Sequence, residues 1–208
     1  MTVQPVSVFG PLDQAIIDAI NNVSMPAFAR VWGIRAELTL DRPAGAWALW
    51  MMREADVPGD LAYHVYRSGV PIAQIFVDTI ARSGDSLCQC VDHELKEMLV
   101  DPTAATILPW PGGSIVKEVC DPVSGDGVDL GGGMTGASFV YPSWFNQGSA
   151  GPWDARGLCT RAGEIRPGGY VEQQVNGQWQ LSAIRDDSGK TSWRVSQHGR
   201  LAYRASNR

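Results

Sequence analysis

The segment SLCQCVDHELKEMLVDP, residues 86–102, carries both a clear helix signal and several side chains that can bind a metal ion. Ser86, followed three residues later by Gln89, forms a capping box in which each side chain satisfies a backbone N–H at the helix start. One apolar stripe follows at helical spacing, made by Leu87, Val91, Leu95 and Met98. The helix is predicted to end at Asp101, because the residue before a proline avoids the helical conformation.

His93, Glu97 and Asp101 are spaced four residues apart, so they share one face of this helix. His93 and Glu97 can both donate an electron pair to a metal ion, and Glu94 lies beside His93. In zinc peptidases with a His-Glu-x-x-His motif, the neighbouring Glu is the general base that activates a metal-bound water. Here Glu97 replaces the second histidine, and a carboxylate oxygen can take that place at about 2.0–2.2 Å from zinc.

A third ligand must come from elsewhere in the chain. Twenty residues separate Glu97 from Glu118, a gap that resembles the gluzincin arrangement, in which a Glu from a later element completes the site. Asp101 and Asp121 are alternative third ligands, or groups that orient His93 by hydrogen bonding. An ordinary alternative is that the polar side chains of the helix form the solvated face that an amphipathic helix needs.

The residues before this segment predict a mixture of helix and strands. A first helix is expected from after Pro11 to about Ser24, ending before Pro26. Strands are predicted at 34–40, 46–52, 61–66 and 71–77. Pro71 cannot donate a hydrogen bond to a neighbouring strand, which favours an edge position for the last of these strands.

The residues after this segment are of two kinds. Residues 103–152 are rich in Gly and Pro and are expected to form an ordered but irregular shell. Asn176-Gly177 lies between two alternating runs, which predicts a type I′ β-hairpin, and a second hairpin is expected through 187–190. We therefore predict an α+β fold with a main domain at 1–150 and a β-hairpin appendage at 151–208.

Composition and charge limit the function. The chain has 208 residues, of which 44% are hydrophobic and 19% charged, enough to bury a core. Residues 151–208 contain nine Lys or Arg and five Asp or Glu, so a total of −5 leaves −9 on residues 1–150. Because an acidic body repels phosphate, nucleic-acid binding is not expected. Neither a transmembrane helix nor a signal peptide is expected, because long apolar runs are absent and the start MTVQPVSVFG lacks a basic region.

Three blocks of this sequence resemble a family of phage and prophage proteins that are described as uncharacterised or as zincin-like metallopeptidases. The blocks are VDHELKEMLVDP (91–102), EVCDP (118–122) and FVYPSWF (139–145). The resemblance extends over about residues 60–170, including Tyr63-His64 and PGGY (167–170). It implies a zincin-like core made of a helix, a mixed sheet with an edge strand, and an active-site helix.

Residue by residue, the resemblance implies a metal ion held by His93, Glu97 and Glu118, with Glu94 as the catalytic base. Zinc is the expected ion, with calcium or manganese as alternatives because carboxylates suit harder cations. One His and two Glu ligands would neutralise the charge of zinc and make it a poorer Lewis acid. Whether the protein is an enzyme is therefore left open.

Two functions follow from these expectations. The first is a virion-associated, metal-dependent peptidase whose extended substrate pairs with strand 71–77, in a cleft lined by His64, Ile72 and Gln74. The second is a structural component of the virion, in the head-tail or tail region, that keeps the zincin scaffold without catalysis. In both, the protein is made in the cytoplasm of the host bacterium and assembles with other virion subunits, with no membrane association.

Overall fold

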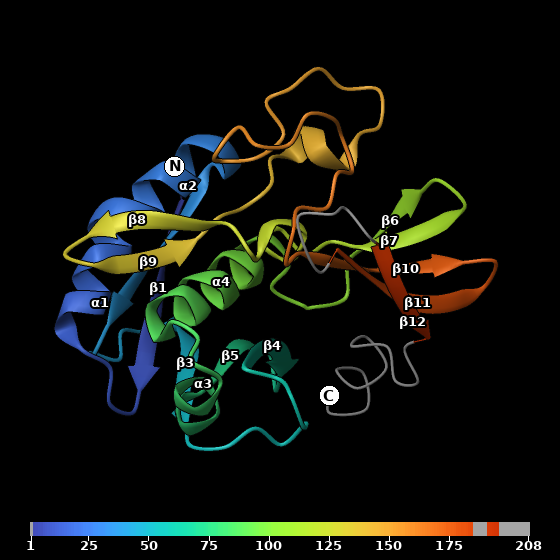
Figure 1. Ribbon diagram of the computed structural model, residues 1–208. Coiled ribbons are helices and arrows are strands. Elements are labelled where there is room, and N and C mark those ends of the chain that lie inside the picture. The colour runs from blue at the N-terminus through green and yellow to red at the C-terminus, as the bar shows by residue number, and fades with distance from the viewer. Residues whose placement is uncertain (1, 185–190, 196–208) are drawn as a thin grey trace. The chain divides into compact units, whose positions relative to one another are not determined.

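The computed structural model describes residues 2–184 and 191–195, and the chain forms two compact units (Figure 1). Unit 1 comprises Met1–Pro102 and Gly127–Ala137, and unit 2 comprises Thr103–Asp126 and Ser138–Arg208. The division therefore does not fall at residue 150, where the sequence places it. The physical reason is strand pairing, because a strand that follows residue 102 joins the sheet of the C-terminal hairpins.

Unit 1 is built on a five-stranded mixed sheet with the order β2-β1-β3-β5-β4. Its strands are β1 (Thr2–Phe9), β2 (Ile34–Thr39), β3 (Trp47–Met52), β4 (Ala62–Arg67) and β5 (Val70–Phe76). The first, second, third and fifth strands run parallel, and β4 runs antiparallel to β5. The expected α+β class with a mixed sheet is thereby confirmed.

Two prolines in this sheet lie where a strand is paired on one side alone. Pro5 lies inside β1, and the pairing of β1 with β3 begins at the next residue, Val6. Pro71 lies near the start of β5, whose pairing with β3 begins at Ile72. A missing N–H is tolerated at such positions. Because β5 lies between β3 and β4, the prediction that it forms the edge of the sheet is wrong, and the edge strands are β2 and β4.

The helices of unit 1 are α1 (Gln14–Ala19), the π-helical η1 (Ile20–Ser24), α2 (Met25–Trp32), α3 (Val77–Ser83) and α4 (Leu87–Val100). The predicted helix end at Ser24 is wrong, because the helical run continues through Pro26. Pro26 lies in the first turn of α2 and continues a helical run in which the Met25 N–H already bonds five residues back, to the Ile20 carbonyl. The π-helical turn before it changes the hydrogen-bond register at this point.

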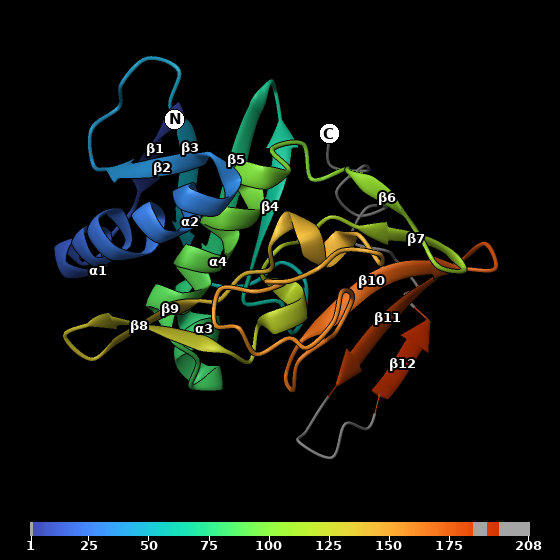
Figure 2. The ribbon, with the colours of Figure 1, turned by 90° about the horizontal axis from the view of Figure 1, so that it is seen from above.

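The core of unit 1 lies between one face of the sheet and the helices, with α2 packed on β2 and α4 packed across β2, β4 and β5 (Figure 2). On the sheet side, Leu49, Ala73 and Ile75 are fully buried. On α4, the apolar stripe contributes the fully buried side chains of Val91, Leu95 and Met98. Removal of this apolar surface from water fixes α4 against the sheet.

A hairpin of β8 (Gly127–Gly131) and β9 (Met134–Ala137) completes unit 1 by packing β9 on α4. The turn between the two strands needs residues that accept positive φ, and the three consecutive glycines at 131–133 have φ of 84°, 61° and 77°. No described helix of the chain combines the length and the apolar character needed to span a bilayer.

Unit 2 contains a second five-stranded sheet, which is antiparallel and has the order β12-β11-β10-β7-β6. Its elements are β6 (Ile107–Trp110), β7 (Gly113–Val116), the 3₁₀ turns η2 (Asp121–Val123) and η3 (Pro142–Phe145), β10 (Tyr170–Val175), β11 (Gln178–Ile184) and β12 (Thr191–Val195). The predicted Asn176-Gly177 hairpin is confirmed, with φ of 51° and 80° at these residues. The turn expected at 187–190 lies outside the described residues, although β11 and β12 pair as a hairpin would require.

Candidate functional site

The helix α4 carries the candidate site and begins and ends as its sequence predicts. The Ser86 hydroxyl accepts a hydrogen bond from the backbone N–H of Gln89 at 3.2 Å, which caps the helix start. Asp101 forms the C-terminal cap, where its N–H donates to the carbonyl of Glu97 at 2.8 Å. The helix thus presents residues 93, 94 and 97 from a rigid element packed on the sheet.

The polar side chains of α4 are not a solvated face. Glu97 has no exposed surface, Lys96 is 2% exposed and Glu94 is 4% exposed. Charged side chains are rarely buried unless they are paired or bind a metal ion. The ordinary alternative, in which these residues face solvent, is therefore wrong for this helix.

His93 and Glu97 face each other along the helix, as their spacing predicts. His93 Nε2 lies 3.2 Å from Glu97 Oε1, with the His93 side chain 13% exposed. Two ligands of a tetrahedral zinc ion, each about 2.0–2.1 Å from the metal, lie about 3.4 Å apart. The distance between His93 Nε2 and Glu97 Oε1 is therefore close to that between two ligands of one zinc ion. It is also a normal hydrogen-bond distance.

His64, at the middle of the edge strand β4, contacts α4 at two points, Glu94 and the C-terminal cap residue Asp101. Its Nδ1 lies 3.3 Å from Glu94 Oε2, and its Nε2 lies 3.1 Å from the backbone carbonyl of Asp101. A carbonyl can only accept, so Nε2 carries the proton and donates to it. The contact of Nδ1 with a carboxyl group then needs one further proton, held either by the imidazole or by Glu94. His64 thereby fixes the position of the Glu94 carboxyl group.

These contacts bring three possible ligands together in unit 1. His64, Glu94 and Glu97 each offer an atom within 4.8 Å of the other two, and all three side chains are buried. Imidazole nitrogen with carboxylate oxygens is a donor set that suits zinc or manganese. The chemistry of these residues therefore fits a divalent cation.

The sequence assigns His64, Ile72 and Gln74 to one cleft, and the strand register separates them. His64 pairs with Ala73, so these two residues point to the face of the sheet on which α4 lies. Ile72 and Gln74 precede and follow Ala73 and point to the other face. The assignment fails because neighbouring residues of a strand alternate between faces, and His64 is the member that reaches the candidate site.

The sequence also predicts Glu118, Asp121 and Asp101 as metal ligands or as groups that orient His93. Glu118 and Asp121 belong to unit 2, where both are buried and Asp121 begins η2. Their roles as metal ligands stay predictions. Asp101 is buried at the end of α4, and the contact that places it near the site is that of its backbone carbonyl with His64.

A second buried polar cluster on α4 lies one residue from the candidate site and was not expected from the sequence. Lys96 Nζ donates to Asp92 Oδ2 at 2.6 Å and to the carbonyl of Ala137 at 2.5 Å. Asp92 also accepts from the Ser24 hydroxyl at 2.7 Å and from the Ala137 N–H at 2.9 Å. The Asp92–Lys96 spacing of four residues is the only sequence signal for the pair, and its partners come from η1 and β9.

Comparisons of the chain with protein-family models, with curated proteins and with solved structures gave no match. The resemblance to zincin-like phage proteins therefore stays a prediction.

Proposed function

We propose that unit 1 is a zincin-like metal-binding domain, and that the whole chain is a virion-associated, metal-dependent peptidase. The observation that carries the proposal is the convergence of His64, Glu94 and Glu97 beside the His93–Glu97 pair. One helix and its neighbouring strand bury, or nearly bury, four side chains that can bind a metal ion. Their burial costs free energy unless a cation or a shared proton compensates their charge.

The order of elements in unit 1 supports the same proposal. A helical run follows β1, an antiparallel edge strand precedes β5, and α4, with the His-Glu-x-x-Glu sequence, follows β5 after the short helix α3. This is the order of helix, strands with an edge strand, and active-site helix that the resemblance implies. An extended peptide would pair with β4, which has one unpaired edge in the described sheet.

In the proposed reaction, His93 and Glu97 hold the metal ion and Glu94 acts as the general base. A bound zinc ion would polarise the substrate carbonyl and make a bound water more acidic. Glu94 accepts the proton of the attacking water and later returns it to the leaving amine. His64, itself held by the Asp101 carbonyl, keeps the Glu94 carboxyl group in place for both transfers.

The first test is the metal content of the purified chain, measured by inorganic mass spectrometry. The wild type is expected to hold about one equivalent of zinc, manganese or calcium, and Glu97→Gln to lose it because an amide is a poorer ligand. Glu37→Gln is the matched control, since Glu37 is an exposed carboxylate of the same unit. Glu118→Gln tests the predicted third ligand. Equal metal in the wild type and Glu97→Gln, or none after loading, would contradict the proposal.

A second candidate function, a structural virion component without catalysis, is favoured by the burial of the cluster. His64 and Glu97 have no exposed surface, and a catalytic site must admit water and substrate. Peptide hydrolysis by the loaded wild type that disappears in Glu94→Gln would support the peptidase. Tightly bound metal, with no hydrolysis in either protein, would instead support the structural component.

A further inference from the structure

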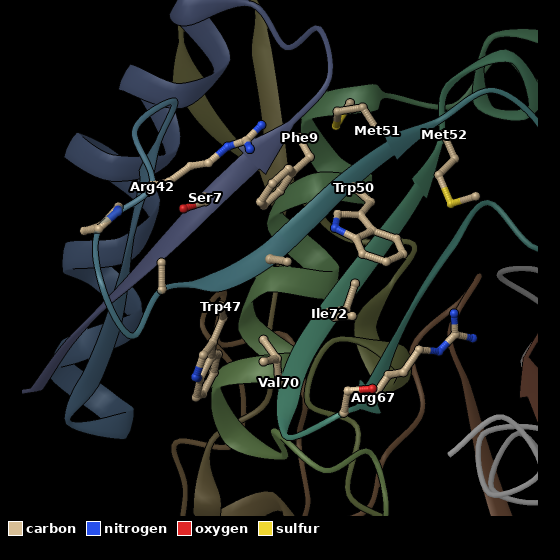
Figure 3. A pocket seen from close by; sticks show the side chains of 14 residues that line it. Ser7, Phe9, Arg42, Trp47, Trp50, Met51, Met52, Arg67, Val70 and Ile72 are labelled. Carbon is tan, nitrogen blue, oxygen red and sulfur yellow. The ribbon is translucent and has the colours of Figure 1, made fainter.

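A pocket of about 710 Å³ lies on the face of the unit 1 sheet opposite to α4 (Figure 3). Strand register defines this face, because Phe9 pairs with Trp50 and Ala48 pairs with Ile72. Figure 3 shows the side chains of Phe9, Trp50 and Ile72 standing on the sheet, with the Trp50 ring near Ile72. The volume lies within the range of about 300–1,000 Å³ that is usual for small-molecule sites.

The floor and walls of this pocket are apolar and partly open to solvent. Met52 is 36% exposed and Val70 is 37% exposed, and the indoles of Trp47 and Trp50 are only half-buried. Sheets of mainly parallel strands usually have both faces covered, and the described helices α2 and α4 pack on the other face. An apolar surface that the described residues of unit 1 leave open in this way indicates a binding site.

The charged side chains that line the pocket are all positive. Arg42 and Arg67 line it, and none of its described lining residues is Asp or Glu. The Arg42 guanidinium carbon lies 4.5 Å from the centre of the Phe9 ring, a cation–π contact at one end of the pocket. Arg67 stands at the other end in Figure 3, beside Val70 in the register of the β4–β5 hairpin. This cationic site contrasts with the charge of −9 on residues 1–150.

We propose that this pocket binds a small organic anion with a flat apolar body, such as an aromatic carboxylate, sulfonate or phosphate ester. The apolar body stacks on Trp50 and contacts Ile72 and Val70, where it leaves water. The anionic group lies at one end of the pocket, beside the guanidinium group of Arg42 or that of Arg67, which can donate to its oxygens. The other guanidinium group attracts it from the opposite end of the pocket. The site is separate from the candidate metal site, because the sheet lies between them.

The test uses two fluorescent probes that share one aromatic skeleton. 8-Anilinonaphthalene-1-sulfonate carries an anionic group, and N-phenyl-1-naphthylamine lacks it. Both are titrated into the full-length chain and into Arg42→Gln, Arg67→Gln and Arg30→Gln. Arg30 is the matched control, because it is an exposed arginine of α2 that does not line the pocket.

The sulfonate is expected to bind about three- to fivefold more weakly to each pocket variant, and with unchanged affinity to Arg30→Gln. The neutral probe should bind the three variants as it binds the wild type. Val70→Glu places a negative charge in the wall of the pocket. It should weaken binding of the sulfonate more than binding of the neutral probe. Far-ultraviolet circular dichroism confirms that each variant is folded.

Three results would overturn the proposal. The first is equal sulfonate affinity in the wild type and both pocket variants, and the second is an equal loss in Arg30→Gln. The third is a concentration-dependent dimer, seen by light scattering and lost in Val70→Glu, with no probe binding. That last result would assign the face to a second copy of the chain.

Discussion

Lys96 and Asp92 form an ion pair that is almost wholly excluded from water, with 2% and 0% of their side chains exposed. Removal of one partner of such a pair leaves the other charge buried without its counter-ion. We expect Lys96→Met to lower the free energy of unfolding by about 3 kcal/mol, measured by urea denaturation. Arg82→Met is the control, because it breaks an exposed ion pair with Glu54 and should change stability little. Similar losses in the two variants would contradict this account of burial.

The thiols of α4 give a second prediction at the residue scale. Burial raises the pKa of Cys88 to about 11 and the pKa of Cys90 to about 12. Only the thiolate reacts with iodoacetamide, so both residues should label far more slowly at pH 8 in the native protein than in urea. The raised pKa values also stabilise the fold below pH 9, and this contribution should be lost as pH rises from about 9 toward 12. Rapid native labelling at either residue, located by peptide mass spectrometry, would refute this.

The candidate site shows which residues a sequence can identify. His93 and Glu97 meet because both lie on one helix at a spacing of four, which is a local property. His64 meets Glu94 because β4 lies at the edge of the sheet in a particular register, and that pairing joins residues 30 positions apart. No local pattern specifies such a contact, so the sequence places His64 near the cleft without giving its partner.

The same distinction holds for whole elements. The Ser86 cap, the apolar stripe of α4 and the Asn176-Gly177 turn are short-range signals, and the structure contains each of them. The strand order is a long-range property, because β5 pairs with β3 across a gap in sequence that β4 occupies. A proline at the start of β5 therefore indicated an edge without showing on which strand the sheet ends.

The docking of the β8–β9 hairpin on α4 can be tested at one glycine. A Cβ atom at Gly136 would lie 2.7 Å from Asp92 Oδ2 and 2.8 Å from Leu130 Cδ1, closer than ordinary contacts. We expect Gly136→Ala to destabilise the protein by about 1–3 kcal/mol in thermal or urea unfolding. Gly148→Ala is the control, because its nearest neighbour would be 3.8 Å away. If the two variants are equally stable, the hairpin does not pack on α4 as described.

At the scale of the molecule, the two units are interleaved in sequence, since residues 127–137 return to unit 1 after the chain has entered unit 2. This return supplies Ala137, whose N–H donates to Asp92 and whose carbonyl accepts from Lys96. A chain cut after residue 102 therefore leaves a buried ion pair without two of its hydrogen-bond partners, which is costly in a dry core.

We therefore expect the fragment 1–102 to lack a cooperative unfolding transition, or to unfold at a lower urea concentration than the fragment 1–137, which keeps the hairpin. Near-ultraviolet circular dichroism reports packing of the tryptophans of unit 1, and tryptophan fluorescence in urea reports the midpoint. Lys96→Met in each fragment is the control, since it should lower the midpoint of 1–137 and matter less in 1–102, where Ala137 is missing. Equal midpoints for the two unmodified fragments would show that residues 1–102 fold without the hairpin, and would move the boundary of unit 1 to residue 102.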